Sequence, residues 1–139
     1  MDVRRISHLL YNESGLRGVS GISDDMRTLQ SSSEPRAAEA IDLFVYRAAR
    51  ELGSLVAALQ GIDALVFTGG IGEHAPDIRA RICALAAYLG IRIDDAANRA
   101  GAARISRDDS AIAVLTLKTN EEFVIARHIR TWLSGQRKR

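Results

Sequence analysis

The stretch LVFTGGIGEHAPDIRARI, residues 65–82, joins a continuous apolar run to a helical pattern through three glycines. The apolar run predicts a short strand that is buried on both faces. Pro76 is typical of a first helical turn and Gly90 of a helix end, so the next segment is predicted to be one helix. A second buried strand is predicted within AIAVLTLKT, residues 111–119. Strands that alternate with helices predict parallel pairing in a layered α/β sheet.

The segments around these strands are also predicted to be mostly helical. Residues 31–61 carry apolar side chains at spacings of one, three and four, which predicts a long packing helix that begins at Ser33 or Glu34. Residues 120–133 predict a further helix. In contrast, residues 11–29 contain glycines at a spacing of three and are predicted to be loop and turn, with one short strand as an open alternative. Residues 94–101 are polar and are also predicted to be a turn.

Composition places the sequence among soluble globular proteins. It has 139 residues, of which 47% are hydrophobic, which is enough for one domain with its own core. The net charge of +2 depends on the terminal GQRKR. The sequence shows no basic stripe, so a nucleic-acid partner is not predicted. No apolar run approaches the ~20 residues of a membrane span. The single cysteine, Cys83, is interpreted as a buried, unreactive thiol, which fits the reducing cytoplasm.

The three glycines between the first strand and the following helix form the first candidate site. Backbone without Cβ at Gly69, Gly70 and Gly72 can approach a ligand closely, and free amides at a helix start favour an anion. The stretch fits neither GxGxxG nor GxxxxGK[ST], so neither a dinucleotide fold nor a P-loop is predicted. The pattern alone leaves two interpretations open, a phosphate contact and a tight turn that needs glycine for steric reasons.

The segment TNEEF, residues 119–123, is the second candidate. Thr119 and Glu122 have the spacing of a capping box, which would commit Glu122 to the backbone and leave Glu121 free. A carboxylate in a first helical turn stays ionised and could bind Mg²⁺. The alternative is simple stabilisation of the helix end.

The segment SDDMR, residues 23–27, is the third candidate. Asp24 or Asp25 could cap a helical turn that begins near Met26. An aspartate, a thioether and a guanidinium could also surround a purine ring, because Arg stacks on it, Met packs on it and Asp accepts from an amine. A surface turn with an Asp25–Arg27 ion pair is the alternative.

Four stretches in this order resemble the acetate kinase family: SGLRGVSGISDDMR, DALVFTGGIGEHAPDIRARI, YLGIRID and TNEEFVIAR. The resemblance extends to propionate kinases. It implies part of the RNase-H-like α/β fold shared by sugar kinases and actin-like ATPases. It also implies reversible phosphoryl transfer between ATP and acetate that gives ADP and acetyl phosphate, with Mg²⁺ as the metal.

The resemblance assigns roles to residues that match the family motifs. Three match the motif around the adenine: Asp25, Met26 and Arg27. Five match the motif that lines the ribose and phosphates: Gly70, Ile71, Gly72, Glu73 and His74. Glu121 matches the glutamate associated with Mg²⁺. The sequence departs from the family pattern at His74, often asparagine, at Met26, often phenylalanine, and at Lys118, usually proline.

The matching stretches correspond to roughly the last third of such a kinase. Residues 1–139 are therefore expected to form its C-terminal nucleotide-binding part, with the N-terminal domain and the acceptor-side catalytic groups outside this sequence and no catalytic residue within it. The expected partners are ATP or ADP, a short carboxylic acid and a second copy of the chain in a homodimer. The alternative is a non-catalytic nucleotide-binding or dimerisation remnant of the same fold.

Overall fold

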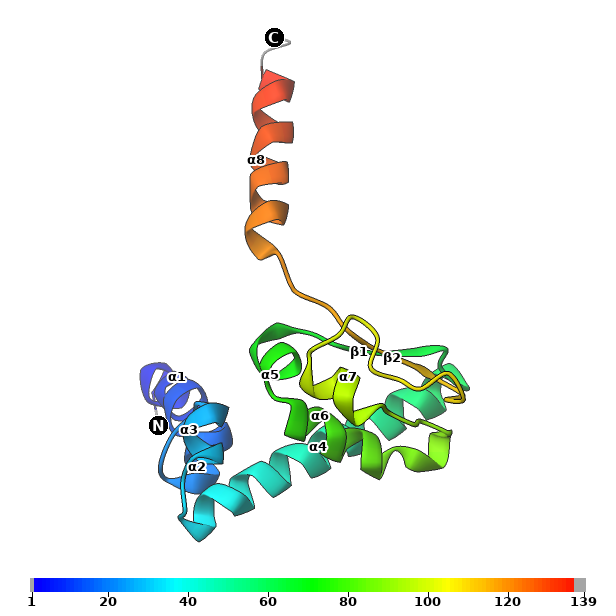
Figure 1. Ribbon diagram of the computed structural model, residues 1–139. Coiled ribbons are helices and arrows are strands. Elements are labelled where there is room, and N and C mark those ends of the chain that lie inside the picture. Colours follow the sequence, from blue (N-terminus) through cyan, green and yellow to red (C-terminus); the bar gives the residue numbers. More distant parts are fainter. Residues whose placement is uncertain (1, 137–139) are drawn as a thin grey trace.

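Two short parallel strands form the sheet of the computed structural model, which describes residues 2–136 (Figure 1). They are β1 (Ala64–Phe67) and β2 (Ala113–Thr116), paired with Leu65 opposite Val114. The Leu117 amide donates to the Phe67 carbonyl at 2.9 Å and extends the pairing by one step. Both strands and their parallel pairing confirm the sequence predictions.

Helices make up the other regular elements of the described chain. In chain order they are α1 (Val3–Asn12), α2 (Gly15–Ser20), α3 (Met26–Gln30), α4 (Pro35–Leu59), α5 (Gly69–His74), α6 (Pro76–Leu85), the 3₁₀ turn η1 (Ala87–Leu89), α7 (Asp95–Arg99) and α8 (Glu121–Gln136).

The long helix α4 packs against α2, α3 and α6. Glu34 occupies its N-cap, Pro35 its first position, and Gln60 ends it in the left-handed region at φ 61°. The predicted apolar stripe is buried in its N-terminal half, where Ile41 and Val45 face α6 and the short helices α2 and α3. A second apolar cluster lies around β2 and includes Val114.

The buried cysteine of that second cluster confirms the sequence interpretation. Cys83 is free and packs among apolar neighbours. Burial raises the pKa of its thiol to about 11. The thiolate is the reactive form of cysteine, so the thiol stays protonated and unreactive near neutral pH.

The predicted loop at residues 11–29 was wrong, because its middle forms α2. Two glycines lower the helix propensity of this segment, but Leu16 and Val19 pack against the core beside α4 and offset that cost. Gly21 then ends the helix at φ 68°, a left-handed conformation that glycine adopts readily.

Three further predictions need correction. The polar turn at residues 94–101 contains α7, because the Asp94 side chain accepts from the Ala97 amide at 2.8 Å and caps it. The single helix predicted up to Gly90 ends at Leu85, where the Ala86 amide is shared between two carbonyls and the chain tightens into η1. The glycine turn is itself helical and forms α5.

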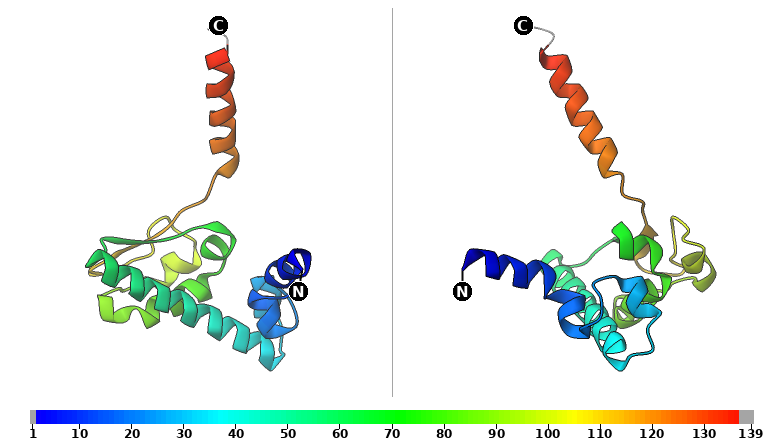
Figure 2. Two further views of the ribbon diagram at one scale, coloured as in Figure 1. Left: turned by 180° about the vertical axis from the view of Figure 1, so that it is seen from behind. Right: turned by 90° about the vertical axis from the view of Figure 1, so that its left-hand side faces the viewer.

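The sheet and the last helix are more exposed than their sequences predict. The β1 strand is covered on one face only: Val66 is 44% exposed, whereas Leu65 and Phe67 on the other face pack against the apolar clusters. Helix α8 stands away from the rest of the described chain in every view (Figures 1 and 2). Its large apolar side chains are exposed: Phe123, Val124, Ile125, Ile129, Trp132 and Leu133.

Candidate functional site

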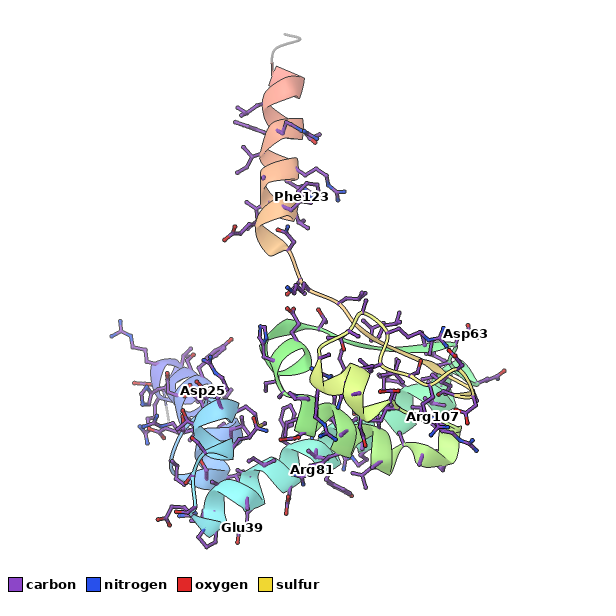
Figure 3. The ribbon with its side chains drawn as sticks, in the orientation of Figure 1. Asp25, Glu39, Asp63, Arg81, Arg107 and Phe123 are labelled. Atoms are coloured by element: carbon purple, nitrogen blue, oxygen red, sulfur yellow. The ribbon has the colours of Figure 1, made fainter. Side chains whose placement is uncertain are left out.

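A pocket of about 300 Å³ brings together two of the three sequence candidates. One wall comes from the segment before α3 and its first residues, Asp24 to Arg27, and the other from α5, with Gly70, Ile71 and His74. Figure 3 shows Asp25 on the part of the chain that lies beside α5. The volume is at the lower end of ligand pockets, about 300–1,000 Å³. The two motifs lie more than forty positions apart, so only the fold makes them neighbours.

The α3 wall is held in place by a helix cap. The Asp25 carboxylate accepts the Arg27 amide at 2.8 Å and pairs with the Arg27 guanidinium at 3.2 Å. These Arg27 contacts lower the pKa of the Asp25 carboxyl, and the predicted cap is confirmed. The Arg27 side chain is 83% exposed, so its flat guanidinium group is free to stack on a ring. Met26 is only 4% exposed and packs mainly into the core.

The structure explains two of the three glycines in the α5 wall, each for a different reason. Gly69 has φ 71°, where other residues are strained. A Cβ on Gly72 would lie 3.1 Å from the carbonyl carbon of Phe67, so close packing on the end of β1 requires glycine there. A Cβ on Gly70 would meet nothing within 4 Å. Neither conformation nor packing within the described chain therefore requires glycine at position 70.

Glu73 faces away from this pocket, although it belongs to the same motif. Its Oε1 accepts three hydrogen bonds, from the Gly69 amide at 3.1 Å, the Thr119 amide at 2.9 Å and the Thr119 hydroxyl at 3.1 Å. The Thr119 amide makes the largest contribution to a lowered pKa of the Glu73 carboxyl. Glu73 instead borders a larger pocket of about 590 Å³ that shares His74 but not the α3 wall.

The start of α8 differs from the predicted capping box. The Asn120 side chain accepts the Phe123 amide at 2.9 Å, so Asn120 caps the helix and Thr119 is engaged by Glu73. Glu121 is the first helical residue, but its side chain lies outside the described part of the structure. Among residues whose side chains are described, no group of three His, Cys, Asp or Glu lies close enough to hold a metal ion.

The sequence reasoning missed Arg79, the largest fully buried side chain, which is 1% exposed. Its guanidinium donates to the Gly72 and Glu73 carbonyls at 2.8 and 2.9 Å, and to the side chain and carbonyl of Asn98. Burial lowers its pKa. Because the carbonyls belong to the last turn of α5, Arg79 fixes the glycine segment to α6 and α7. An arginine within a helix pattern gives no sequence signal for this role.

Comparison with known proteins identifies the family of the chain. The profile of the Acetokinase family matches residues 1–127. The acetate kinase of Rhodopseudomonas palustris (strain TIE-1) is 60% identical over 99% of this chain and 35% of its own length. The acetate kinase of Rhizobium meliloti is 52% identical over 97% of this chain and 34% of its own length.

Solved structures give the same result. The crystal structure of Porphyromonas gingivalis acetate kinase superposes with a TM-score of 0.85, at 34% identity over 96% of this chain and 35% of that chain. A propionate kinase from Francisella tularensis gives a TM-score of 0.81, at 36% identity over 91% of this chain and 33% of that chain.

The fold is therefore part of the RNase-H-like α/β fold of actin-like ATPases and sugar kinases. Within that class, the chain belongs to the acetokinase family. It spans about a third of the length of the curated relatives that it matches. No helix among residues 2–136 is long and apolar enough to span a membrane.

Replacing Arg79 tests whether it fixes the glycine segment. Arg79→Lys should lower the free energy of unfolding by at least about 2 kcal/mol. One ammonium group cannot reach all the buried oxygen atoms that the forked guanidinium of Arg79 bonds to. Arg81→Lys on the same helix is the control, since its exposed ion pair with Asp42 contributes under about 1 kcal/mol. Urea unfolding measures both, and equal effects would contradict the assignment.

Proposed function

We propose that the chain is the C-terminal, nucleotide-binding part of an acetate kinase, a cytoplasmic enzyme. The complete enzyme transfers a phosphoryl group reversibly between ATP and acetate, with Mg²⁺, and gives ADP and acetyl phosphate. The proposal extends the family membership to an activity that the relatives carry in their names. The family match also covers most of the chain, residues 1–127.

The exposed backbone at Gly70 is the observation that carries the proposal. Gly69 and Gly72 are explained by conformation and packing inside the chain, whereas Gly70 borders the pocket with open space before it. Arg27 borders the same pocket, and its side chain is 83% exposed while its guanidinium pairs with Asp25. An open backbone opposite a planar cation suits a flat ring with a polar substituent, such as the base and ribose of a nucleotide.

In this proposal the chain positions the nucleotide and leaves the acid to another part of the enzyme. Asp25, Met26 and Arg27 surround the adenine, with Met26 contributing only the edge that remains exposed. The residues of the 70–74 segment other than Glu73 border the ribose and phosphates. Phosphoryl transfer depends mainly on positioning and charge stabilisation, so the chain alone is expected to have little activity.

Mg²⁺ would be held through Glu121. A magnesium ion in such enzymes is bound by one or two carboxylates together with waters and substrate phosphates, so one glutamate at the start of α8 fits that donor set. The ion would neutralise charge on the phosphates when bound. The Asn120 cap and the Thr119 contacts hold the backbone that leads into Glu121.

The exposed surfaces support the proposal that more protein covers this chain. The outer edge of β1 is unpaired in the described sheet, and α8 exposes a ring of large apolar side chains that includes Phe123 and Trp132. The missing two thirds of the kinase would cover the strand edge and part of α8. A homodimer would cover apolar surface as well.

A hybrid enzyme tests the proposed activity. This chain would replace the matching third of the R. palustris acetate kinase, with the parent enzyme and the parent lacking that third as controls. The hybrid should form acetyl phosphate from ATP, Mg²⁺ and acetate, measured as the hydroxamate, and the truncated parent should not.

A folded hybrid with no product from acetate or propionate would contradict the assignment. It would favour the second candidate, a non-catalytic remnant that binds nucleotide or dimerises. The exposed apolar side chains of α8 are the observation in favour of that alternative.

The Gly70 backbone should control nucleotide affinity in the active hybrid. Gly70→Val should raise the KM for ATP by about tenfold or more, because the side chain would occupy the space that a ligand approaches. Folding should be little affected, since a Cβ at this position would meet no atom within 4 Å. Ala38→Val, on the exposed side of α4, is the control. An unchanged KM would mean that Gly70 does not face the nucleotide.

A further inference from the structure

The Glu73 carboxylate joins two segments that lie 46 positions apart in the sequence. One oxygen accepts from Gly69, at the start of α5, and from both donors of Thr119, between β2 and α8. The glycine segment and the segment before α8 are therefore tied to one atom. We call the Glu73, Gly69 and Thr119 contacts the carboxylate clamp.

The clamp makes the start of α5 less able to bind an anion. The Gly69 amide is one of the free donors that would otherwise be open to an anion at a helix start. It is already bonded to Glu73. The carboxylate also places a negative charge there, which repels a second anion. Glu73 is thus engaged within the chain, and its acceptor oxygen points to Thr119 instead of the pocket beside α3.

Three consecutive residues connect the carboxylate clamp to the start of α8. Thr119 is held by Glu73, Asn120 caps the helix through the Phe123 amide, and Glu121 follows as the first helical residue. Thr119 lies only three residues after β2 ends at Thr116. The backbone of Glu121 is therefore placed by the strand on one side and by the cap on the other, with the clamp between them.

We propose that Glu73 is a positioning residue that fixes Glu121 relative to the nucleotide pocket through Thr119. This inference rests on the proposed function, in which Glu121 serves the metal ion. Glu73 then affects the response of the enzyme to Mg²⁺, and the nucleotide is bound by the other residues of the motif. The competing assignment is that Glu73 contacts the ribose or phosphates directly.

Amide hydrogen exchange on the chain itself tests the clamp without any enzyme activity. Glu73→Ala should increase the exchange rates of the Gly69 and Thr119 amides by about tenfold or more, since both lose a charged acceptor. Amides in α4 near Ile41 should keep their rates, which shows that the chain remains folded. Glu39→Ala, an exposed glutamate of α4 that Figure 3 labels, is the control.

Variants at the other end of the clamp separate its two donors. Thr119→Val removes the hydroxyl and keeps the amide, so it should raise the exchange rate of the Thr119 amide less than Glu73→Ala does. Thr119→Ser keeps both donors and should restore the protection. Unchanged exchange of the Thr119 amide in Glu73→Ala would overturn the clamp.

Kinetics of the active hybrid test what the clamp is for. Glu73→Ala should raise the Mg²⁺ concentration at half-maximal rate by about tenfold, as removal of partners around a metal ligand commonly does. The KM for ATP at saturating Mg²⁺ should change by less than twofold. A large increase in that KM with an unchanged Mg²⁺ response would overturn the proposal in favour of direct nucleotide contact.

The two measurements keep the inference separate from the proposed function. An inactive wild-type hybrid with an intact exchange result would reject the kinase assignment, and with it the metal role of the clamp, but would leave the contacts established. An active hybrid whose Glu73→Ala variant keeps both its exchange rates and its Mg²⁺ response would reject the inference alone.

Discussion

The buried guanidinium of Arg79 is the interaction on which the candidate site depends. It bonds to the last turn of α5 and to Asn98 of α7, while its own backbone belongs to α6. Asn98 in turn donates to the Pro76 carbonyl at 2.9 Å, at the start of α6. A buried charge is costly unless its donors are satisfied. These acceptors satisfy it only when the three helices hold one arrangement, which places Gly70 and His74 opposite α3.

In the proposed function, the candidate site is one wall of a larger structure. The pocket between α3 and α5 offers an exposed cation and open backbone, and Glu73 faces the opposite side, toward Thr119. Two kinds of exposure accompany this wall, a strand edge without a partner in the described sheet and a last helix covered with large apolar side chains. Both are expected where a segment spans a third of its relatives' length.

Patterns within short stretches of sequence predicted those elements whose structure depends on neighbouring residues. The long helix, both strands, their parallel pairing and the Asp25 cap follow from apolar period and capping chemistry, and the structure confirms them. The glycine-rich segments were harder to predict. Gly15 and Gly69 begin short helices that are stable only through packing against α4 or bonding to Arg79, and neither partner is visible in a local window.

Most residues that border the pocket between α3 and α5 were among the sequence candidates, but the direction of the Glu73 carboxylate was not predictable. Resemblance to the family named Glu73 together with Gly70, yet the structure turns the Glu73 carboxylate toward Thr119. Thr119 itself matched a capping box that the Asn120 side chain forms instead. Each choice depends on a contact between segments far apart in the sequence, so spacing alone could not decide it.

In the proposed function, Gly70 and Arg27 face a nucleotide while Glu73 holds the segment before α8. A crystal structure of the hybrid kinase with ADP and Mg²⁺ tests it most directly. We expect the adenine in the pocket between α3 and α5, beside Arg27, with the Glu73 carboxylate still bonded to Thr119. A nucleotide bound elsewhere, or a Glu73 carboxylate turned onto the ribose or phosphates, would contradict it.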